Sequence, residues 1–360
     1  FETKVKLVPH NPLLLRHRAK DLTRFFFNEK NYCEVETPIL VPCPGLEKDL
    51  HYFSSSWQDF RGQKHQMFLR SSPELHMKKL LSQGHSKIYE IAKVFRNGGE
   101  LASWHQPEFL MLEWYEKNLS FFDLIAQTES LIFFLQDGLS SFYKKTPMLK
   151  LPEKFLHLSV AEAFLEFSGL KLIDMDQGLA AKAREKNIIS VRQDDDFETA
   201  MHKILIEKIE PQLKKLQAVV LYDYPASQAA LARIEGGVAK RFEIYLNGVE
   251  ICNGYDELLD SAQNRKRAFE VNKGRKEINL EPIKLDQDFF TCLDKIKSPC
   301  AGNALGFERV LALLMGFKQL APLNSFFKSK PFTLENSSDD HSISTVSSES
   351  SSVSGSFCST

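Results

Sequence analysis

Two alternating runs of residues flank the dipeptide Asn247-Gly248, and this segment constrains the fold more than any other part of the chain. Asn-Gly is the dipeptide most strongly favoured in a two-residue hairpin turn. Because the side chains of a strand alternate between its two faces, a turn at this dipeptide sets a register for 241–253. That register places Glu243 and Glu250 as diagonal neighbours on one face and leaves the other face apolar. The predicted pairs are Leu246 with Val249, Tyr245 with Glu250, Ile244 with Ile251 and Glu243 with Cys252.

Helix-start signals recur along the chain. Asn11 followed by Pro12 is typical of an N-cap and a first helical residue, and apolar residues then recur at helical spacing. Pro73 after two serines indicates a second helix, and Ser159 with Glu162 forms a capping box for a third. The sequence therefore predicts helices that begin near residues 12, 73 and 160, a further helix over 197–216, and an extended segment over 33–38 that ends at a proline.

The charges of the chain are balanced. Lys and Arg number 46 and Asp and Glu number 47, which leaves a net charge of −1. No general attraction to a phosphate backbone or an anionic membrane follows, so stable tRNA or DNA binding is not expected. Apolar runs stay below the ~18 residues of a membrane span, and we expect a cytoplasmic protein. The six cysteines form no C-x-x-C pair, which argues against a disulfide frame and a zinc–thiolate site.

Composition divides the chain into a long mixed segment and a short serine-rich end. The 43% apolar content suffices for a sizeable core. Beyond Phe332 the chain turns to Ser, Asp, Glu and Thr with few core-forming residues. We therefore predict one folded domain over 1–332 and a disordered tail over 333–360.

Three separated segments form an ordered set. Residues 25–38 suggest a helix and a strand ending in proline, 94–97 and 105–109 flank a seven-residue loop, and 304–309 contain a glycine and an arginine where a strand gives way to a helix. In this order and spacing they resemble the three motifs of class II aminoacyl-tRNA synthetases. The resemblance implies an α+β fold, an antiparallel β-sheet flanked by helices, and a two-fold dimer formed through 25–38.

Four more segments narrow the resemblance. Residues 72–74, 111–115, 225–228 and 250–258 look like lysyl-type sequences. Over 11–327 the chain resembles lysyl-tRNA synthetases and their paralogues, ligases that attach a lysine-type residue to translation elongation factor P. A bacterial lysyl-tRNA synthetase carries an anticodon-binding barrel before this core, and no such segment is apparent here. That difference favours elongation factor P as the acceptor.

Amino-acid activation explains the residue types of the motifs. A carboxylate attacks the α-phosphate of ATP, so cations must neutralise the negative charge that develops at phosphorus. The resemblance implies that Arg96 and Arg309 supply this charge as catalytic residues, and that Glu243 and Glu250 share Mg²⁺, which prefers oxygen ligands. The implied ATP-binding residues are Arg96, Asn97, Glu100, His105, Gln106, Glu108, Phe109, Glu250, Ile251, Gly306 and Arg309.

A lysine-type substrate carries two ammonium groups, and buried carboxylates should hold them because an unpaired buried charge is costly. Glu257, Glu113 and Tyr115 resemble the pocket for the side-chain amine, and Glu74 resembles the residue that receives the other amine. The substrate's own carboxylate is the nucleophile, so no covalent enzyme intermediate is expected. The implied substrate-binding residues are Ser72, Pro73, Glu74, Glu113, Tyr115, Asn253, Glu257 and Ala304.

Three positions depart from one or other family pattern. Ala304 stands where lysyl-tRNA synthetases have glycine and the paralogous ligases have alanine, which favours (R)-β-lysine over lysine. In the ligases an acidic residue directly follows Arg96-Asn97, whereas this chain has Gly98-Gly99-Glu100. Glu100 is therefore a candidate to take the place of that acidic residue. Gln106 replaces an asparagine and keeps the amide.

Single residues also have ordinary explanations. Ser71 and Glu74 could form only a capping box, Glu243 and Glu250 could be a solvated strand face, and His105 could lie in the core. The conjunction of all motifs favours an AMP-forming ligase that activates (R)-β-lysine or lysine and transfers it to elongation factor P. Two alternatives stay open: a lysine activator acting on tRNA or a small molecule, and a catalytically silent regulator.

Overall fold

A long, mixed β-sheet forms the centre of the protein. The computed structural model describes residues 11–98, 103–143 and 148–323. Its main sheet has the strand order β1-β5-β6-β12-β11-β10-β8-β7, with β9 beside β10. The inner pairs are antiparallel, as expected, whereas the outer pairs β1–β5 and β7–β8 are parallel. The strands are β1 Cys33–Glu34, β5 Lys87–Phe95, β6 Glu108–Lys117, β7 Leu156–Ser159, β8 Ala218–Pro225, β9 Ile234–Glu235, β10 Val238–Leu246, β11 Val249–Asp256 and β12 Cys300–Gly306.

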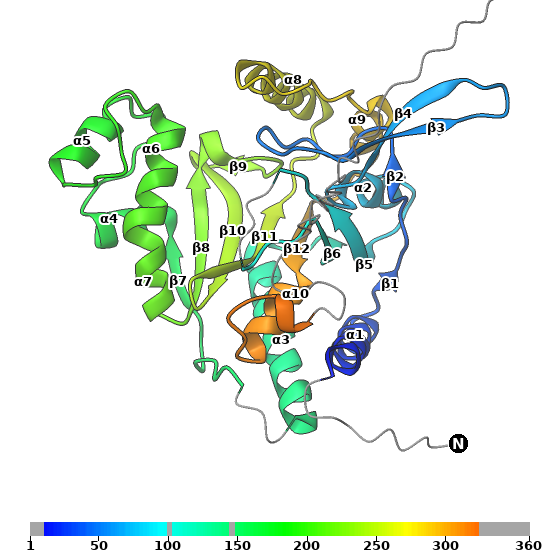
Figure 1. Ribbon diagram of the computed structural model, residues 1–360, viewed down its shortest axis with the longest axis horizontal. Coiled ribbons are helices and arrows are strands. Elements are labelled where there is room, and N and C mark those ends of the chain that lie inside the picture. Colours follow the sequence, from blue (N-terminus) through cyan, green and yellow to red (C-terminus); the bar gives the residue numbers. More distant parts are fainter. Residues whose placement is uncertain (1–10, 99–102, 144–147, 324–360) are drawn as a thin grey trace, which may run out of the picture.

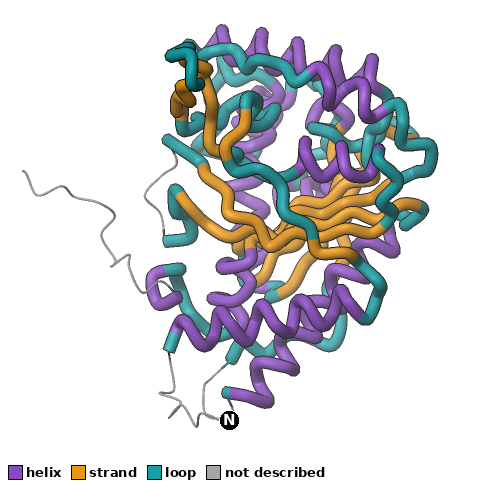
Figure 2. Tube along the Cα trace, turned by 90° about the vertical axis from the view of Figure 1, so that its right-hand side faces the viewer, coloured by secondary structure: helices purple, strands orange, loops and turns teal. Residues whose placement is uncertain are grey.

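A smaller sheet and the helices surround this layer. The small sheet has the order β2-β4-β3, and its β3 and β4 project from the body as a ribbon (Figure 1). Figure 2 shows the main sheet as a layer with helices above and below it. The remaining elements are β2 Leu40–Val41, β3 Ser54–Gln58, β4 Lys64–Leu69, α1 Pro12–Asn28, α2 Glu74–Ser82, α3 Phe121–Phe142, α4 Val160–Ser168, α5 Leu179–Glu185, α6 Phe197–Ile204, η1 Leu205–Ile209, α7 Glu210–Lys215, η2 Ala226–Gln228, α8 Ser261–Glu277, α9 Gln287–Leu293, α10 Phe307–Leu314 and η3 Ala321–Leu323.

The two faces of the main sheet are covered differently. On one face α1, α3 and α10 close the largest apolar core, which includes Trp114 from β6 and Leu305 from β12. On the other face α4–α7 pack at the β8 end, against residues such as Tyr245, and α2, α8 and α9 pack at the β5 end, against residues such as Tyr115. Between these two groups a strip of the second face carries polar side chains.

The local helix signals are largely confirmed. Asn11 caps α1 and accepts hydrogen bonds from the amides of Leu13 and Leu14, and Ser159 and Glu162 form both bonds of a capping box. Pro73, the predicted first residue of the second helix, is the N-cap of α2, so the helix begins one residue later than predicted. The alternative capping box of Ser71 with Glu74 is wrong, because the Ser71 hydroxyl donates to the carbonyl of Pro44.

The helix predicted over 197–216 is present with an irregular centre. It comprises α6, the π-helical η1 and α7, so that helical turns continue from Phe197 to Lys215. Pro211 lies at the start of α7 and has no amide proton to donate to the preceding turn. A local widening of the helix beside a proline is the physical consequence.

The Asn247-Gly248 hairpin forms, and its register changes after two pairs. Both turn residues have positive φ, 49° and 77°, as the predicted turn requires. Leu246 pairs with Val249 and Tyr245 with Glu250, as predicted, but Ile244 pairs with Cys252 and Glu243 with Asn253. The predicted pairs Ile244–Ile251 and Glu243–Cys252 are therefore wrong.

A β-bulge explains this shift. Ile251 and Cys252 together oppose Ile244, and both lie in the core of α1, α3 and α10. An inserted residue changes which residues face each side of the strand beyond it. Glu250 and Asn253 can therefore lie on the same face although three positions separate them.

The described parts of the chain contain no helix that is both long enough and apolar enough to cross a membrane. The predicted tail over 333–360 and its boundary at 332 lie outside the described residues.

We predict that Gly254→Ala destabilises the fold by about 1–3 kcal/mol, because a methyl group there overfills the core. A Cβ on Gly254 would lie 2.3 Å from the ring of the fully buried Phe242, its cross-strand partner. Urea unfolding measures the loss. Gly254→Ala combined with Phe242→Leu should lose less stability than the two single losses added together; simple additivity would contradict the steric explanation.

Candidate active site

The strand register lays the site out as two rows across the open strip of the main sheet. Residues two apart along a strand share a face, so both rows point to the same side. One row is Glu243, Asn253, Ala304, Glu113 and Glu90 on β10, β11, β12, β6 and β5, and the next is Arg241, Tyr255, Gly302, Tyr115 and Ile88 on the same strands. Glu243, Glu113 and Ala304, which come from different motifs, thus meet on one surface.

At the β6 end of the strip, three glutamates lie together with a lysine and a tyrosine. We call this cluster the amine pocket: Glu74, Lys78, Glu113, Tyr115 and Glu257. The Lys78 ammonium is 2.6 Å from Glu74 Oε1 and 2.6 Å from Glu257 Oε2. The Tyr115 hydroxyl donates to Glu113 Oε1 at 2.6 Å. Lys78 and Glu113 are each 1% exposed and Glu257 3%. Two buried carboxylates, Glu113 and Glu257, and the partly exposed Glu74 therefore share one ammonium.

Burial controls the electrostatics of the amine pocket. It raises the pKa of Glu113 well above its ordinary value, and the neighbouring Glu74 raises it further. Burial also raises the pKa of Glu257 to about 8, and the Lys78 ammonium opposes that rise. For Lys78 burial alone would lower the pKa, but Glu257 and Glu74 together raise it above its ordinary value. The pocket is therefore short of positive charge.

Two buried carboxylate oxygens of the amine pocket, Glu113 Oε2 and Glu257 Oε1, have neither a hydrogen bond nor an ion pair among the described residues. Glu257 Oε2 also lacks a hydrogen bond, but it forms the ion pair with Lys78. A buried acceptor without a donor is costly, so a site of this kind favours a ligand that brings donors. An ammonium group supplies both the donors and the missing positive charge.

A glycine makes room for this arrangement. A Cβ on Gly302 would lie 2.3 Å from the ring of Tyr115 and 2.9 Å from Glu257 Oε1. Only a residue without a side chain lets Tyr115 cross β12 at this point and lets Glu257 approach it.

At the other end of the strip two arginines lie near a carboxylate. Arg309, at the start of α10, donates from Nη1 to the carbonyl of Glu250 and from Nε to that of Trp104. Arg96 lies 5.5 Å from the centre of the Phe109 ring. Burial lowers the pKa of Arg309, and Arg96 lowers it further while Glu250 opposes. Two guanidinium groups held this close favour an anion such as a phosphate group between them.

Glu243 and Glu250 lie on the same face beside these arginines. Glu243 is 6% exposed; its Oε1 accepts from Arg241 at 2.5 Å and its Oε2 from Tyr245 at 2.7 Å. Burial, together with the neighbouring carboxylate of Glu243, raises the pKa of Glu250 to about 7. No group of three or more metal-ligating side chains occurs among the described residues. The pair fits a cation whose other ligands come from phosphates and water, with Glu250 as the more available ligand.

Two of the remaining expected residues, Ala304 and Asn253, lie in the first row of the strip. Ala304 lies between Asn253 and Glu113, and the Asn253 amide oxygen accepts from Arg241 at 3.1 Å.

His105 is exposed and Gln106 half-buried in the segment that leads into β6. Pro73 and Gly306 are the N-caps of α2 and α10, the Ser72 hydroxyl accepts from the amide of Glu74, and Asn97 accepts from that of Gly98.

The side chains of two expected residues lie away from the site, and a third expected residue is not described by the structure. The Ile251 side chain lies in the core on the opposite face, so only its backbone can reach a ligand. Glu108 forms an ion pair with Lys93 at 2.9 Å on the surface. Glu100 lies outside the described residues.

Two charged residues of the site were missed from the sequence. Lys78 and Arg241 both approach the site carboxylates within hydrogen-bonding distance. Lys78 is four positions after Glu74, which is one helical turn, and Arg241 is two positions before Glu243 on one strand face. Both spacings could have indicated that the lysine and the arginine lie next to a site carboxylate. Neither spacing, however, indicates that the pair of residues is buried.

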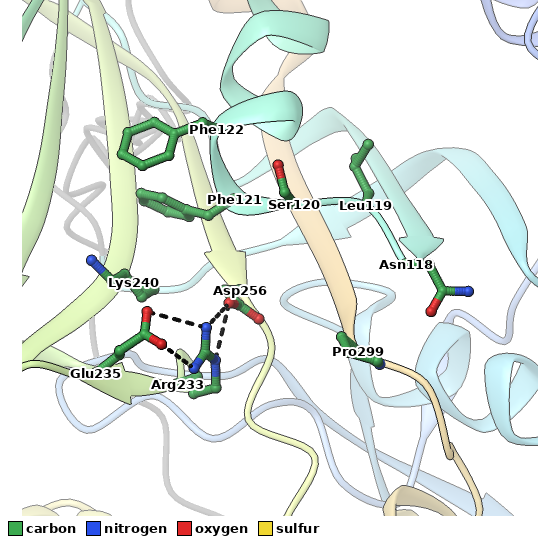
Figure 3. A pocket seen from close by; sticks show the side chains of 10 residues that line it. All are labelled: Asn118, Leu119, Ser120, Phe121, Phe122, Arg233, Glu235, Lys240, Asp256 and Pro299. Carbon is green, nitrogen blue, oxygen red and sulfur yellow. Dashed lines mark hydrogen bonds and ion pairs between the residues drawn. The ribbon is translucent and has the colours of Figure 1, made fainter.

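A surface pocket of about 470 Å³ lies outside the strip, at the ends of the strands (Figure 3). Arg233 is its central charge, and its guanidinium pairs with Asp256 and Glu235. Lys240 pairs with Asp223. The charges of this pocket are thus satisfied within the protein, in contrast to those of the amine pocket.

The fold defines the class of protein: a mixed sheet, antiparallel at its centre, with helices on both faces and a polar strip on one of them. The chain matches the model of the family "tRNA synthetases class II (D, K and N)" over residues 5–330. It therefore belongs to the class II tRNA synthetase family, whose members are ATP-dependent ligases.

Particular relatives of the chain share one name. The "Elongation factor P--(R)-beta-lysine ligase" of Haemophilus influenzae (strain PittGG) is 32% identical over 318 residues, which cover 87% of this chain and 94% of the relative. The protein of that name from Avibacterium paragallinarum is also 32% identical over 318 residues, 87% of this chain and 94% of the relative. That from Buchnera aphidicola subsp. Schizaphis graminum is 33% identical over 314 residues, 84% and 91%.

We predict that Glu113→Gln flattens the dependence of stability on pH. Because its folded-state pKa is raised, Glu113 keeps a proton that the unfolded chain releases, so stability falls as pH rises from about 4.5 through the raised value. Removing the carboxyl removes up to about 1.4 kcal/mol per pH unit of that fall. Urea unfolding at pH 5, 6.5 and 8 measures how steeply the free energy of unfolding changes with pH in the wild-type protein and in the variant. The surface variant Glu108→Gln should keep the wild-type slope, and parallel slopes for Glu113→Gln would refute the burial argument.

Proposed function

We propose that the protein activates (R)-β-lysine, or lysine, with ATP and transfers it to a lysine side chain of translation elongation factor P. The observation that carries this proposal is the amine pocket, where three carboxylates and one ammonium leave room for two further positive charges. A diamino acid supplies two ammonium groups. The shared name of the relatives supports the same substrate and acceptor.

The first half-reaction follows from the layout of the strip. Glu74 receives the amine near the substrate carboxylate, while Glu113, Tyr115 and Glu257 receive the side-chain amine. The substrate carboxylate then attacks the α-phosphorus of ATP; a C–O–P bond forms, and the bond to the bridging oxygen breaks to release pyrophosphate. Arg96 and Arg309 offset the charge that develops on the phosphoryl oxygens. Mg²⁺, held by Glu250 with Glu243, would supply further positive charge to the phosphates.

The second half-reaction needs no nucleophile from the protein. A neutral lysine amine of the acceptor attacks the acyl carbon of the adenylate, an amide bond forms, and AMP leaves with the bonding electrons. The amine loses its proton in the same step. Water must be kept from the adenylate until the acceptor arrives.

Assembly and location are part of the proposal. We place the enzyme in the cytoplasm, where its acceptor takes part in translation. A two-fold dimer through 25–38 fits the surface of α1, where Leu13 is 58% and Phe25 56% exposed.

The proposal predicts amino-acid-dependent exchange of pyrophosphate into ATP, and transfer of label to elongation factor P. The purified protein is incubated with ATP, Mg²⁺ and labelled lysine or (R)-β-lysine, with elongation factor P and with tRNA in separate reactions. Label on the protein factor alone supports the proposal. Label on tRNA alone would identify the alternative activator, and no exchange with either amino acid would identify a silent regulator.

A second prediction concerns the choice between the two lysines. Ala304 lies between Asn253 and Glu113, so its methyl group narrows the strip where the substrate backbone lies. Ala304→Gly should shift the ratio of kcat/KM values toward lysine by roughly 5- to 150-fold, since one methyl group in a pocket is worth ~1–3 kcal/mol. Exchange assays with both amino acids measure the ratio. An unchanged ratio would mean that this methyl group does not determine specificity.

A further inference from the structure

We propose that Lys78 is a positioning residue of the amine pocket: a fixed internal cation that orients Glu74 and Glu257 to receive the two ammonium groups of a diamino acid. The inference deepens the proposed function and rests on it for the identity of the substrate. The Lys78 side chain is 1% exposed and contacts two of the carboxylates proposed to bind the substrate.

The Lys78 ammonium forms ion pairs with two carboxylates at once and so bridges them. Its Nζ lies 2.6 Å from Glu74 Oε1 on its own helix and 2.6 Å from Glu257 Oε2, which follows β11. The two oxygens therefore lie at most 5.2 Å apart, twice the length of one bridge. One side chain thus ties together the carboxylates proposed to receive opposite ends of the substrate.

Burial distinguishes this bridge from an ordinary ion pair on a helix surface. Lys78 is 1% exposed, whereas an exposed pair four residues apart on a helix contributes little to stability because water screens it. Its Nζ also lies 5.7 Å from the centre of the Tyr115 ring. A buried ammonium at this position is held by Glu74, Glu257 and the face of Tyr115, all of which belong to the amine pocket.

The charges of the pocket show what the bridge accomplishes. With a diamino acid bound and all three carboxyls ionised, Glu74, Glu113 and Glu257 carry three negative charges, and the Lys78 ammonium offsets one of them. The remainder equals the two positive charges of a diamino acid. Lys78 pairs with Oε2 of Glu257. Among the described residues, neither Oε1 of Glu257 nor Oε2 of Glu113 has a donor. The oxygens that remain can then receive the side-chain ammonium from fixed positions.

Without Lys78 the carboxylates lose this arrangement. Glu257 would be buried with no cation beside it, and a buried carboxylate in that state takes up a proton or turns toward water. Either response weakens recognition of the side-chain ammonium, while the distant arginine site is unaffected.

The first experiment measures the bridge without any substrate. Thermal unfolding is followed for Lys78→Met, Glu257→Gln and the double variant, all ligand-free. We expect Lys78→Met to lower the Tm markedly, and the double variant to recover most of that loss because the unpaired carboxylate is gone. Additive losses would overturn the proposal. If Lys78→Met does not fold, recovery of a folded double variant supports the bridge, and failure of both contradicts it.

The second experiment measures substrate recognition by pyrophosphate exchange. Lys78→Met should raise KM for the diamino acid at least tenfold, change KM for ATP less than twofold, and reduce the preference for lysine over norleucine, which lacks the side-chain amine. The matched control is Lys79→Met on the same helix, whose Nζ pairs with Asp286 at 2.5 Å outside the pocket; it should keep all three values.

The outcomes of the two experiments separate the two proposals. Equal losses for lysine and norleucine, or an unchanged KM for the diamino acid, would overturn the positioning role. If the wild-type protein shows no amino-acid-dependent exchange, the proposed function fails, while the Tm cycle still decides whether Lys78 forms the bridge.

Discussion

The burial of Glu113 and Glu257 beside a single ammonium, which they share with the partly exposed Glu74, is the constraint on which the rest of the site depends. Removing charges from water is costly unless each is paired, and this cluster is left incompletely paired. Such an arrangement persists only where the surrounding fold holds it in place. Here α2 supplies Glu74 and Lys78, β6 supplies Glu113, and the segment after β11 supplies Glu257. The pocket is therefore a property of the packed sheet and helix together.

The opposite face of the sheet offsets that cost. The core closed by α1, α3 and α10 contains Trp114 and Leu305, whose strands carry Glu113 and Ala304 on the other face. Because side chains alternate along a strand, one set of residues stabilises the fold while its neighbours serve the site. Natural enzymes commonly combine a stable scaffold with a destabilising site in this way. The bulge at Ile251 lets β11 serve both faces, since it turns Glu250 and Asn253 to the same side.

Much of the fold followed from local sequence chemistry. The caps at Asn11 and Ser159 and the turn at Asn247-Gly248 formed as predicted, because each depends on a few adjacent residues. The class of sheet was also predicted, from the resemblance of the motifs. The bulge was not, because it depends on how Ile251 and Cys252 pack beneath distant helices. The Ser71 hydroxyl likewise found its partner in Pro44, which no local pattern indicates.

The sequence by itself determined which chemical groups were available, namely the arginines of two motifs and the carboxylates Glu74, Glu113 and Glu257. Only the tertiary structure decided how these groups pair. Lys78 and Glu257 are far apart in the chain yet 2.6 Å apart in space, and Arg241 occupies an oxygen of Glu243. The physical reason is that a charge is paired or left unpaired according to its burial and its neighbours, and both are set when strands and helices from separate parts of the chain pack together.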